Sequence, residues 1–107
     1  MTADAIVFVY ITAGSRGEAE TIGRTLVEER LAACVNILGG MTAIYRWEGA
    51  VETAEEVAFI AKTRAALVAA LAARVKALHS YDVPCVVALP AGPGNPDYLD
   101  WLRRETA

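Results

Sequence analysis

The feature that most constrains this chain is residues 33–62, which read as two unusually long strands joined by a tight turn. The first arm, residues 33–47, is rich in valine, isoleucine and aromatic residues, and the second, residues 52–62, ends in alternating apolar side chains. Such residues favour strands because β-branched and aromatic groups pack well on a pleated surface. Glu48-Gly49 supplies the turn, and Gly39-Gly40 predicts a bulge or bend in the first arm.

The length of this ribbon is informative. An arm of fifteen residues at about 3.3 Å each extends about 50 Å, whereas a domain of this size is only about 35 Å across. The ribbon should therefore overshoot its own globule or bend, and an overshooting ribbon exposes apolar side chains and unpaired edge groups. Two interpretations are open: ordinary strands broken at Gly39-Gly40, or a ribbon that builds a subunit interface, most simply in a closed symmetric ring.

The composition of the chain favours the subunit-interface interpretation. With 107 residues the chain is expected to form one domain over residues 1–107, and its hydrophobic content of 55% exceeds the usual range. This excess of hydrophobic residues suggests that apolar surface is buried between subunits. A net charge of −3 argues against nucleic acid or an anionic membrane as partner. The N-terminal residues lack the basic start of a secretory signal, and no apolar run reaches membrane-spanning length.

The remaining segments predict the order of elements. An apolar strand over residues 5–12 is followed by a helix that Ser15 and Glu18 begin as a capping box. After the ribbon, Thr63 is expected to cap a helix over residues 64–79. A buried strand over residues 85–89 and a short terminal helix begun by Asn95 and Pro96 complete the chain.

The order β-α-β-β-α-β plus a terminal helix predicts an α+β fold of the ferredoxin-like split β-α-β type. Its helices would cover one face of a four-stranded antiparallel sheet. The other face is apolar enough to suggest burial by neighbouring subunits.

Several short segments carry a resemblance to a known family. They are LAACVN (residues 31–36), IYRWEG (residues 44–49), Glu55, Lys62-Thr63, HSYDVP (residues 79–84) and NPDYLDW (residues 95–101). In this order and at this spacing the chain resembles the divalent-cation tolerance proteins, the CutA family. The resemblance covers nearly the whole chain. It implies a ferredoxin-like fold, a tight homotrimer built through the long central strands, a role in tolerance of copper and other divalent metals, a cytoplasmic location and no established enzyme activity.

The resemblance also bears on metal binding. The copper ligands proposed for the family are a cysteine in the first strand and two adjacent histidines, and the matching positions here are Ile11, Leu78 and His79. Only His79 agrees. One imidazole does not make a site, because copper(II) and zinc usually take three or four protein ligands. His79 is therefore either a metal ligand, for copper or another divalent cation, or a residue that bonds the free carbonyls at a helix C-terminus.

The ribbon tip and its neighbours form the second candidate site. Exposed aromatic residues beside an arginine often mark a contact surface. They could pack in an interface or line a ligand cleft between subunits. The candidate cleft residues are Tyr45, Arg46, Trp47, Glu48, Glu55, Lys62 and Tyr81, and the candidate trimer-interface residues are Asn36, Ile44, Tyr45, Trp47 and Trp101.

Three classes of function follow. The first is a non-enzymatic homotrimer of divalent-cation tolerance that acts either by binding metal weakly or by acting on another protein. The second is a small-ligand sensor resembling the trimeric PII signalling proteins, although the basic, glycine-rich phosphate loop of such proteins is missing. The third, an enzyme, is disfavoured because one histidine leaves no recognisable acid–base or nucleophilic set.

Overall fold

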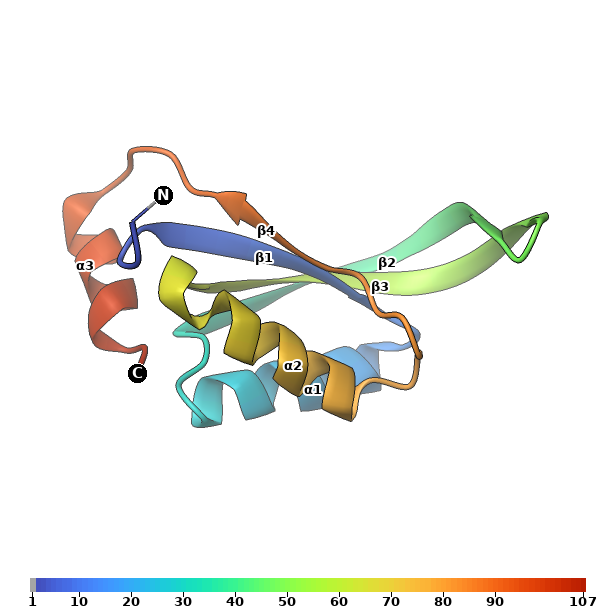
Figure 1. Ribbon diagram of the computed structural model, residues 1–107, viewed down its shortest axis with the longest axis horizontal. Helices are drawn as coiled ribbons and strands as arrows, with labels where there is room; N and C mark the ends of the chain where they lie inside the picture. The colour runs from blue at the N-terminus through green and yellow to red at the C-terminus, as the bar shows by residue number, and fades with distance from the viewer. Residues whose placement is uncertain (1) are drawn as a thin grey trace.

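The computed structural model describes residues 2–107 (Figure 1). One four-stranded sheet has the order β2-β3-β1-β4, and every neighbouring pair is antiparallel. The predicted α+β class and antiparallel sheet are confirmed. The elements are β1 (Ile6–Ala13), α1 (Arg16–Glu28), β2 (Cys34–Trp47), β3 (Ala50–Arg64), the 3-10 helix η1 (Ala65–Leu67), α2 (Val68–Leu78), β4 (Val86–Pro90) and α3 (Pro96–Arg104).

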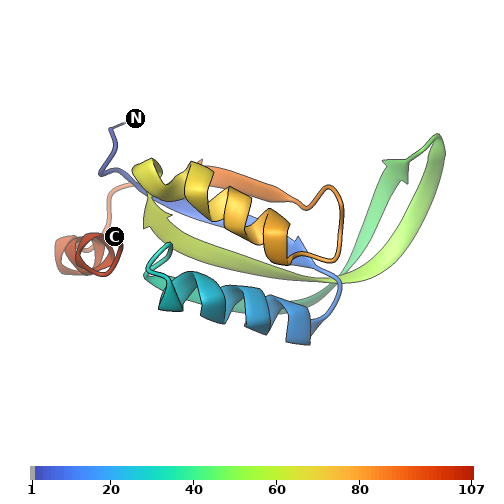
Figure 2. The same cartoon turned by 60° about the horizontal axis from the view of Figure 1, so that its bottom comes forward.

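Helices α1 and α2 lie side by side on one face of the sheet, and α3 lies at the end opposite the ribbon tip (Figure 2). Alternation along the central strands turns Val9, Ile11 and Phe59 toward α1 and α2, where they are fully buried with Ile22 and Leu71. The face that α1 and α2 leave uncovered is called the open face below. Its central residues Phe8, Tyr10 and Ile60 are half-buried.

Helix α1 begins as the sequence predicts, with one difference. The Ser15 hydroxyl accepts the Glu18 N–H at 3.1 Å, but the Glu18 carboxylate accepts the N–H of Gly14 at 3.0 Å rather than that of the cap residue. Further along, a Cβ at Gly23 would lie 2.9 Å from Cγ1 of Val35. Glycine thus allows α1 to approach β2 closely.

The ribbon is the longest feature of the molecule. Strands β2 and β3 have 14 and 15 residues, and the chain measures 44 × 25 × 23 Å along its principal axes. Glu48 and Gly49 both have positive φ, as the two-residue type I′ turn requires. A bulge lies between Ile37 and Gly39. Beyond it the ribbon bends and projects past the helices, so it both bends and overshoots (Figures 1 and 2).

Two details of the predicted elements are wrong. Thr63 does not cap a helix: β3 continues to Arg64 because its ladder with β1 extends to the pair Ile6–Arg64. Thr63 is buried in that strand, and its hydroxyl has no hydrogen-bond partner among residues 2–107. Strand β4 is not buried on both faces, since Val87 and Leu89 are exposed on the open face.

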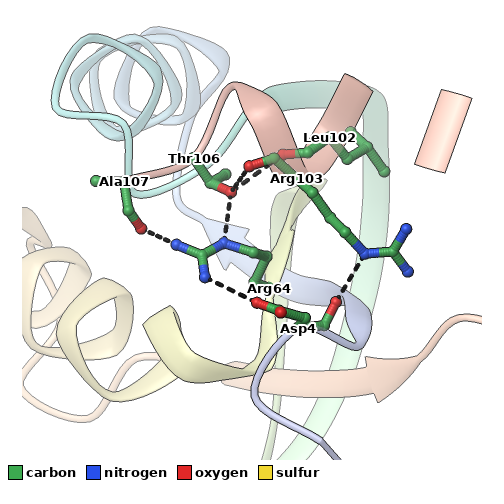
Figure 3. A network of polar contacts seen from close by, with 6 residues as sticks. All are labelled: Asp4, Arg64, Leu102, Arg103, Thr106 and Ala107. Carbon is green, nitrogen blue, oxygen red and sulfur yellow. Dashed lines mark hydrogen bonds and ion pairs between the residues drawn. The ribbon is translucent and has the colours of Figure 1, made fainter. Parts of the chain in front are cut away.

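Helix α3 is fastened to the sheet by Arg64 (Figure 3). Its guanidinium donates to the Thr106 hydroxyl at 3.0 Å, to the Asp4 carboxylate at 3.2 Å and to the main-chain oxygen of Ala107. Arg103 adds a bond of 3.0 Å to the main-chain oxygen of Asp4. The segment after α3 and the segment before β1 are therefore held at the same end of the sheet.

Candidate functional site

A groove of about 540 Å³ lies where the ribbon leaves the sheet, between the end of β1, the ribbon and the loop that joins α2 to β4. Sites for small ligands usually lie in clefts of roughly 300–1,000 Å³. We call it the root groove. Its lining residues are Thr12, Tyr45, Arg46, Trp47, Glu52, Glu56, Tyr81, Asp82, Val83 and Cys85.

Four of the seven cleft residues predicted from the sequence line the root groove. They are Tyr45, Arg46, Trp47 and Tyr81. The other three predicted residues do not line it within one chain. Glu48 lies in the turn at the ribbon tip. Glu55 accepts a hydrogen bond from the Thr42 hydroxyl at 2.9 Å, and Lys62 lies near α3, where its ammonium donates to the Tyr98 hydroxyl at 3.0 Å.

Sequence reasoning missed three acidic groove residues, Glu52, Glu56 and Asp82. The signal for Glu52 was present, because a two-residue turn fixes hairpin register. With Glu48 and Gly49 in the turn, Tyr45 pairs with Glu52 and Thr42 pairs with Glu55. Directly opposed residues share one face of a hairpin. Glu52 therefore belongs beside Tyr45.

Tyr81 and Glu56 form the inner wall of the groove. The Tyr81 hydroxyl donates to Oε2 of Glu56 at 2.9 Å. Burial, together with this carboxylate, raises the pKa of Tyr81 to about 12. Burial and Glu56 also raise the pKa of the Cys85 thiol. At neutral pH both groups are protonated, so Tyr81 is a fixed donor and Cys85 is an uncharged, half-buried thiol.

His79 lies behind the groove, and its side chain is fully buried. Its Nδ1 accepts the Tyr81 N–H at 3.0 Å, which leaves Nε2 to donate to the main-chain oxygen of Thr12 at 2.7 Å. Both ring nitrogens are thus engaged, and a metal ion would have to displace one of these bonds. Ile11, at the position where the resemblance implies a cysteine, is fully buried in the core. Within residues 2–107, no group of three or more His, Cys, Asp or Glu side chains is arranged to hold a metal ion.

The Glu18 carboxylate lies beside His79 and makes the stability of the fold depend on pH. Its carboxylate accepts N–H groups from Gly14 and Ser80 and lies 3.7 Å from Nδ1 of His79. Burial acts to raise its pKa, but the hydrogen bonds from Ser80 and Gly14 outweigh burial, so the pKa of Glu18 is lowered.

We expect Glu18→Gln to lower stability at neutral pH and to remove part of the acid sensitivity. Because the folded pKa is lowered, the stability that Glu18 contributes is complete above the pKa of an unfolded glutamate and is lost as pH falls through the folded pKa. Urea unfolding at a series of pH values measures this, with Glu20→Gln, which removes only an exposed pair with Arg16, as the control. A constant difference from wild type at every pH would contradict the assignment.

The predicted interface residues are distributed along the molecule. Ile44 is 73% exposed, Trp47 is 47% exposed, and Asn36 is exposed on the edge strand β2. Trp101 lies near the other end of the sheet, stacked on Tyr98 with ring centroids 5.8 Å apart. A second groove of about 490 Å³ lies there on the open face, lined by Phe8, Tyr10, Ile60, Leu89, Tyr98 and Leu99 together with residues 90–95.

None of the described helices is long and apolar enough to cross a membrane. The molecule is a small α+β protein with a projecting hairpin, an exposed apolar face and a groove at the hairpin's root. Residues 7–105 match the family described as CutA1 divalent ion tolerance protein. The chain belongs to this family.

The similarity extends to curated proteins and solved structures. The divalent-cation tolerance protein CutA of Thermus thermophilus is 54% identical over 92% of this chain and 95% of its own length. A solved structure from Thermus thermophilus superposes with a TM-score of 0.93 at 52% identity, covering 95% of this chain and 99% of that one. Protein CutA 1, chloroplastic, of Oryza sativa is 45% identical over 94% of this chain, which spans only 56% of that relative.

Proposed function

We propose that this protein is a non-enzymatic homotrimer of divalent-cation tolerance, with the ferredoxin-like split β-α-β fold. The observation that carries the proposal is the family match over residues 7–105. Strand order agrees with the proposed fold, because β1 and β2 are both antiparallel to the β3 that separates them.

Exposed apolar surface supports a multimer. Ile44, Val51 and Trp47 are exposed on the ribbon, and Val87 and Leu89 are exposed on the open face. Large apolar side chains left exposed in this number are typical of contact surfaces in soluble proteins. A ribbon that projects beyond its own globule can reach a neighbouring copy. Light scattering on the purified, tag-free protein should give three times the 11.4 kDa mass of one chain.

The proposed metal ligand is His79, for copper or another divalent cation. Because the imidazole must release a hydrogen bond of its own, we expect weaker binding than at a preformed site with three or four ligands. Calorimetric titration of copper(II) and zinc into wild type and His79→Gln tests this, with circular dichroism to confirm that the variant folds. Saturable heat that disappears in the variant supports His79. Heat unchanged in the variant, or absent from wild type, overturns that site.

A second candidate function is a small-ligand sensor, and the root groove favours it. A trimer could complete this groove as an inter-subunit cleft, with Glu48, Glu55 and Lys62 contributed by a neighbouring subunit. Growth in copper of a host strain deleted for the gene separates the two functions. If a groove variant such as Trp47→Leu restores growth in copper, metal tolerance does not depend on the groove. If Trp47→Leu is folded and trimeric but does not restore growth, the result supports the sensor.

The cytoplasmic location remains a prediction from the family resemblance. Relatives differ in their descriptions: the Oryza sativa protein is named chloroplastic, and a CutA structure from Archaeoglobus fulgidus, 45% identical with a TM-score of 0.90, is described as periplasmic. Fractionation of the native cells with an antibody against this chain would assign the compartment.

A further inference from the structure

We infer that the root groove binds a small organic cation, an ammonium group carried on an apolar body. This inference rests on the second proposed function, that the groove holds a ligand. It adds the chemical class of that ligand. It is carried by aromatic rings, carboxylates that form no ion pair and a threonine hydroxyl, all lining one groove.

Three aromatic residues, Tyr45, Trp47 and Tyr81, line the groove. Tyr45 and Trp47 are two residues apart on β2 and share one strand face, whereas Tyr81 comes from the loop after α2. Aromatic faces attract ammonium groups through the ring quadrupole, and tryptophan does so most strongly. The rings also provide the apolar contact that an organic body needs and that a hydrated inorganic ion does not.

Three acidic residues, Glu52, Glu56 and Asp82, also line the groove. They outnumber its one basic residue, Arg46. Within residues 2–107, none of these four side chains forms an ion pair. The groove therefore has an excess of negative charge that its own residues do not neutralise. Low-dielectric walls around such charge concentrate cations.

The arrangement of these carboxylates distinguishes an organic cation from a metal ion. A divalent metal needs several oxygen ligands within about 2.0–2.6 Å of one point. Three acidic residues line the groove, yet no three acidic, histidine or cysteine side chains among the described residues are arranged to hold a metal. Carboxylates spread around aromatic rings match an extended cation instead.

A threonine hydroxyl in the lining of the groove adds a hydrogen-bonding group to the rings and carboxylates. Thr12 is only 6% exposed, and its side chain lines the groove. Its main-chain oxygen is bonded to His79. Its hydroxyl has no hydrogen bond to another residue within 2–107, and it is open to solvent in the groove, since Thr63 carries the only buried side-chain atom without a partner among the described residues. A ligand N–H that entered the groove would find an acceptor there.

The test uses three probes that share one body and differ in charge: 2-phenylethylammonium, 2-phenylethanol and phenylacetate. Each is titrated into the full-length protein and followed by the amide and indole NMR signals of the groove residues. We expect the ammonium to bind about tenfold more tightly than the alcohol, a difference of about 1.4 kcal/mol, and the carboxylate not to bind.

Two variants assign the effect to named groups. Glu52→Gln and Asp82→Asn each remove a carboxylate that has no partner in the fold, so both should remain folded. Each should weaken ammonium binding about threefold or more while leaving the alcohol unchanged. The matched control is Glu105→Gln, an equal loss of charge at the C-terminal end of α3, at the opposite end of the molecule from the ribbon tip, and it should change nothing.

The outcomes separate this inference from the proposal beneath it. Preferential ammonium binding that weakens in both groove variants supports the inference. Binding of the alcohol or the carboxylate with equal or greater affinity overturns the organic cation but keeps a ligand groove. Failure of all three probes to shift any groove signal overturns both.

Discussion

Replacing Ile44 with aspartate is expected to dissociate the protein into monomers, at protein concentrations where the wild type is fully assembled. Ile44 is 73% exposed on the projecting part of the ribbon, where its own chain does not cover it. If a neighbouring copy covers it, aspartate places an unpaired charge in an apolar interface. Such a charge costs about 3–5 kcal/mol, which is about a hundredfold or more in the assembly constant. Sedimentation velocity over a concentration series measures the change.

Thr21→Asp, an equal change of charge at an exposed position of α1, is the control and should leave assembly intact. Circular dichroism shows whether each variant is folded. An Ile44→Asp protein that sediments like wild type over the whole series would exclude the ribbon from the interface.

We expect His79→Ala to reduce the free energy of unfolding by about 3–5 kcal/mol. The imidazole is fully buried and joins the end of β1 to the loop after α2 through Thr12 and Tyr81. Alanine leaves a cavity and removes the partners of two partly buried main-chain groups, the Thr12 oxygen and the Tyr81 N–H. Small domains have a total stability of only 5–15 kcal/mol, so this is one of the largest effects available to a single substitution.

Urea unfolding at fixed protein concentration measures this effect, because assembly makes stability depend on concentration. Lys76→Ala, at an exposed position of the same helix, should change stability by less than about 0.5 kcal/mol. A loss below about 1 kcal/mol in His79→Ala would show that water replaces the imidazole at little cost. Such a result would reopen the metal interpretation.

Much of the fold could be predicted because local and long-range signals agree in it. The alternation of Val57, Phe59 and Ala61, the caps at Ser15 and Asn95 and the turn at Glu48-Gly49 are all present in the structure. The prediction that Thr63 caps a helix was wrong for a physical reason. Threonine caps helices well in isolation, but the β1–β3 ladder continues past it, and no local pattern reports a hydrogen bond to a strand some fifty residues away.

The groove was only half predictable. Tyr45 and Trp47 stand out as aromatic residues in a ribbon, and Glu52 follows from register once the turn is fixed. Thr12, Asp82 and Cys85 come from segments that meet the ribbon only in the folded chain. The buried position of His79 likewise depends on where β1 ends relative to α2, which sequence spacing does not fix.

The central place of β1 has a consequence for how the chain acquires its structure during synthesis. Of the described elements, β1 is made first, yet it lies between β3 and β4, its hydrogen-bonding partners. About fifty residues separate the end of β1 from the end of β3, roughly 3–10 s of translation. Throughout that time the apolar segment Ile6–Ala13 has no strand to pair with, while the β2–β3 hairpin can close on itself as soon as it emerges. The hairpin is thus the natural template, and the first strand to leave the ribosome is among the last to join the sheet.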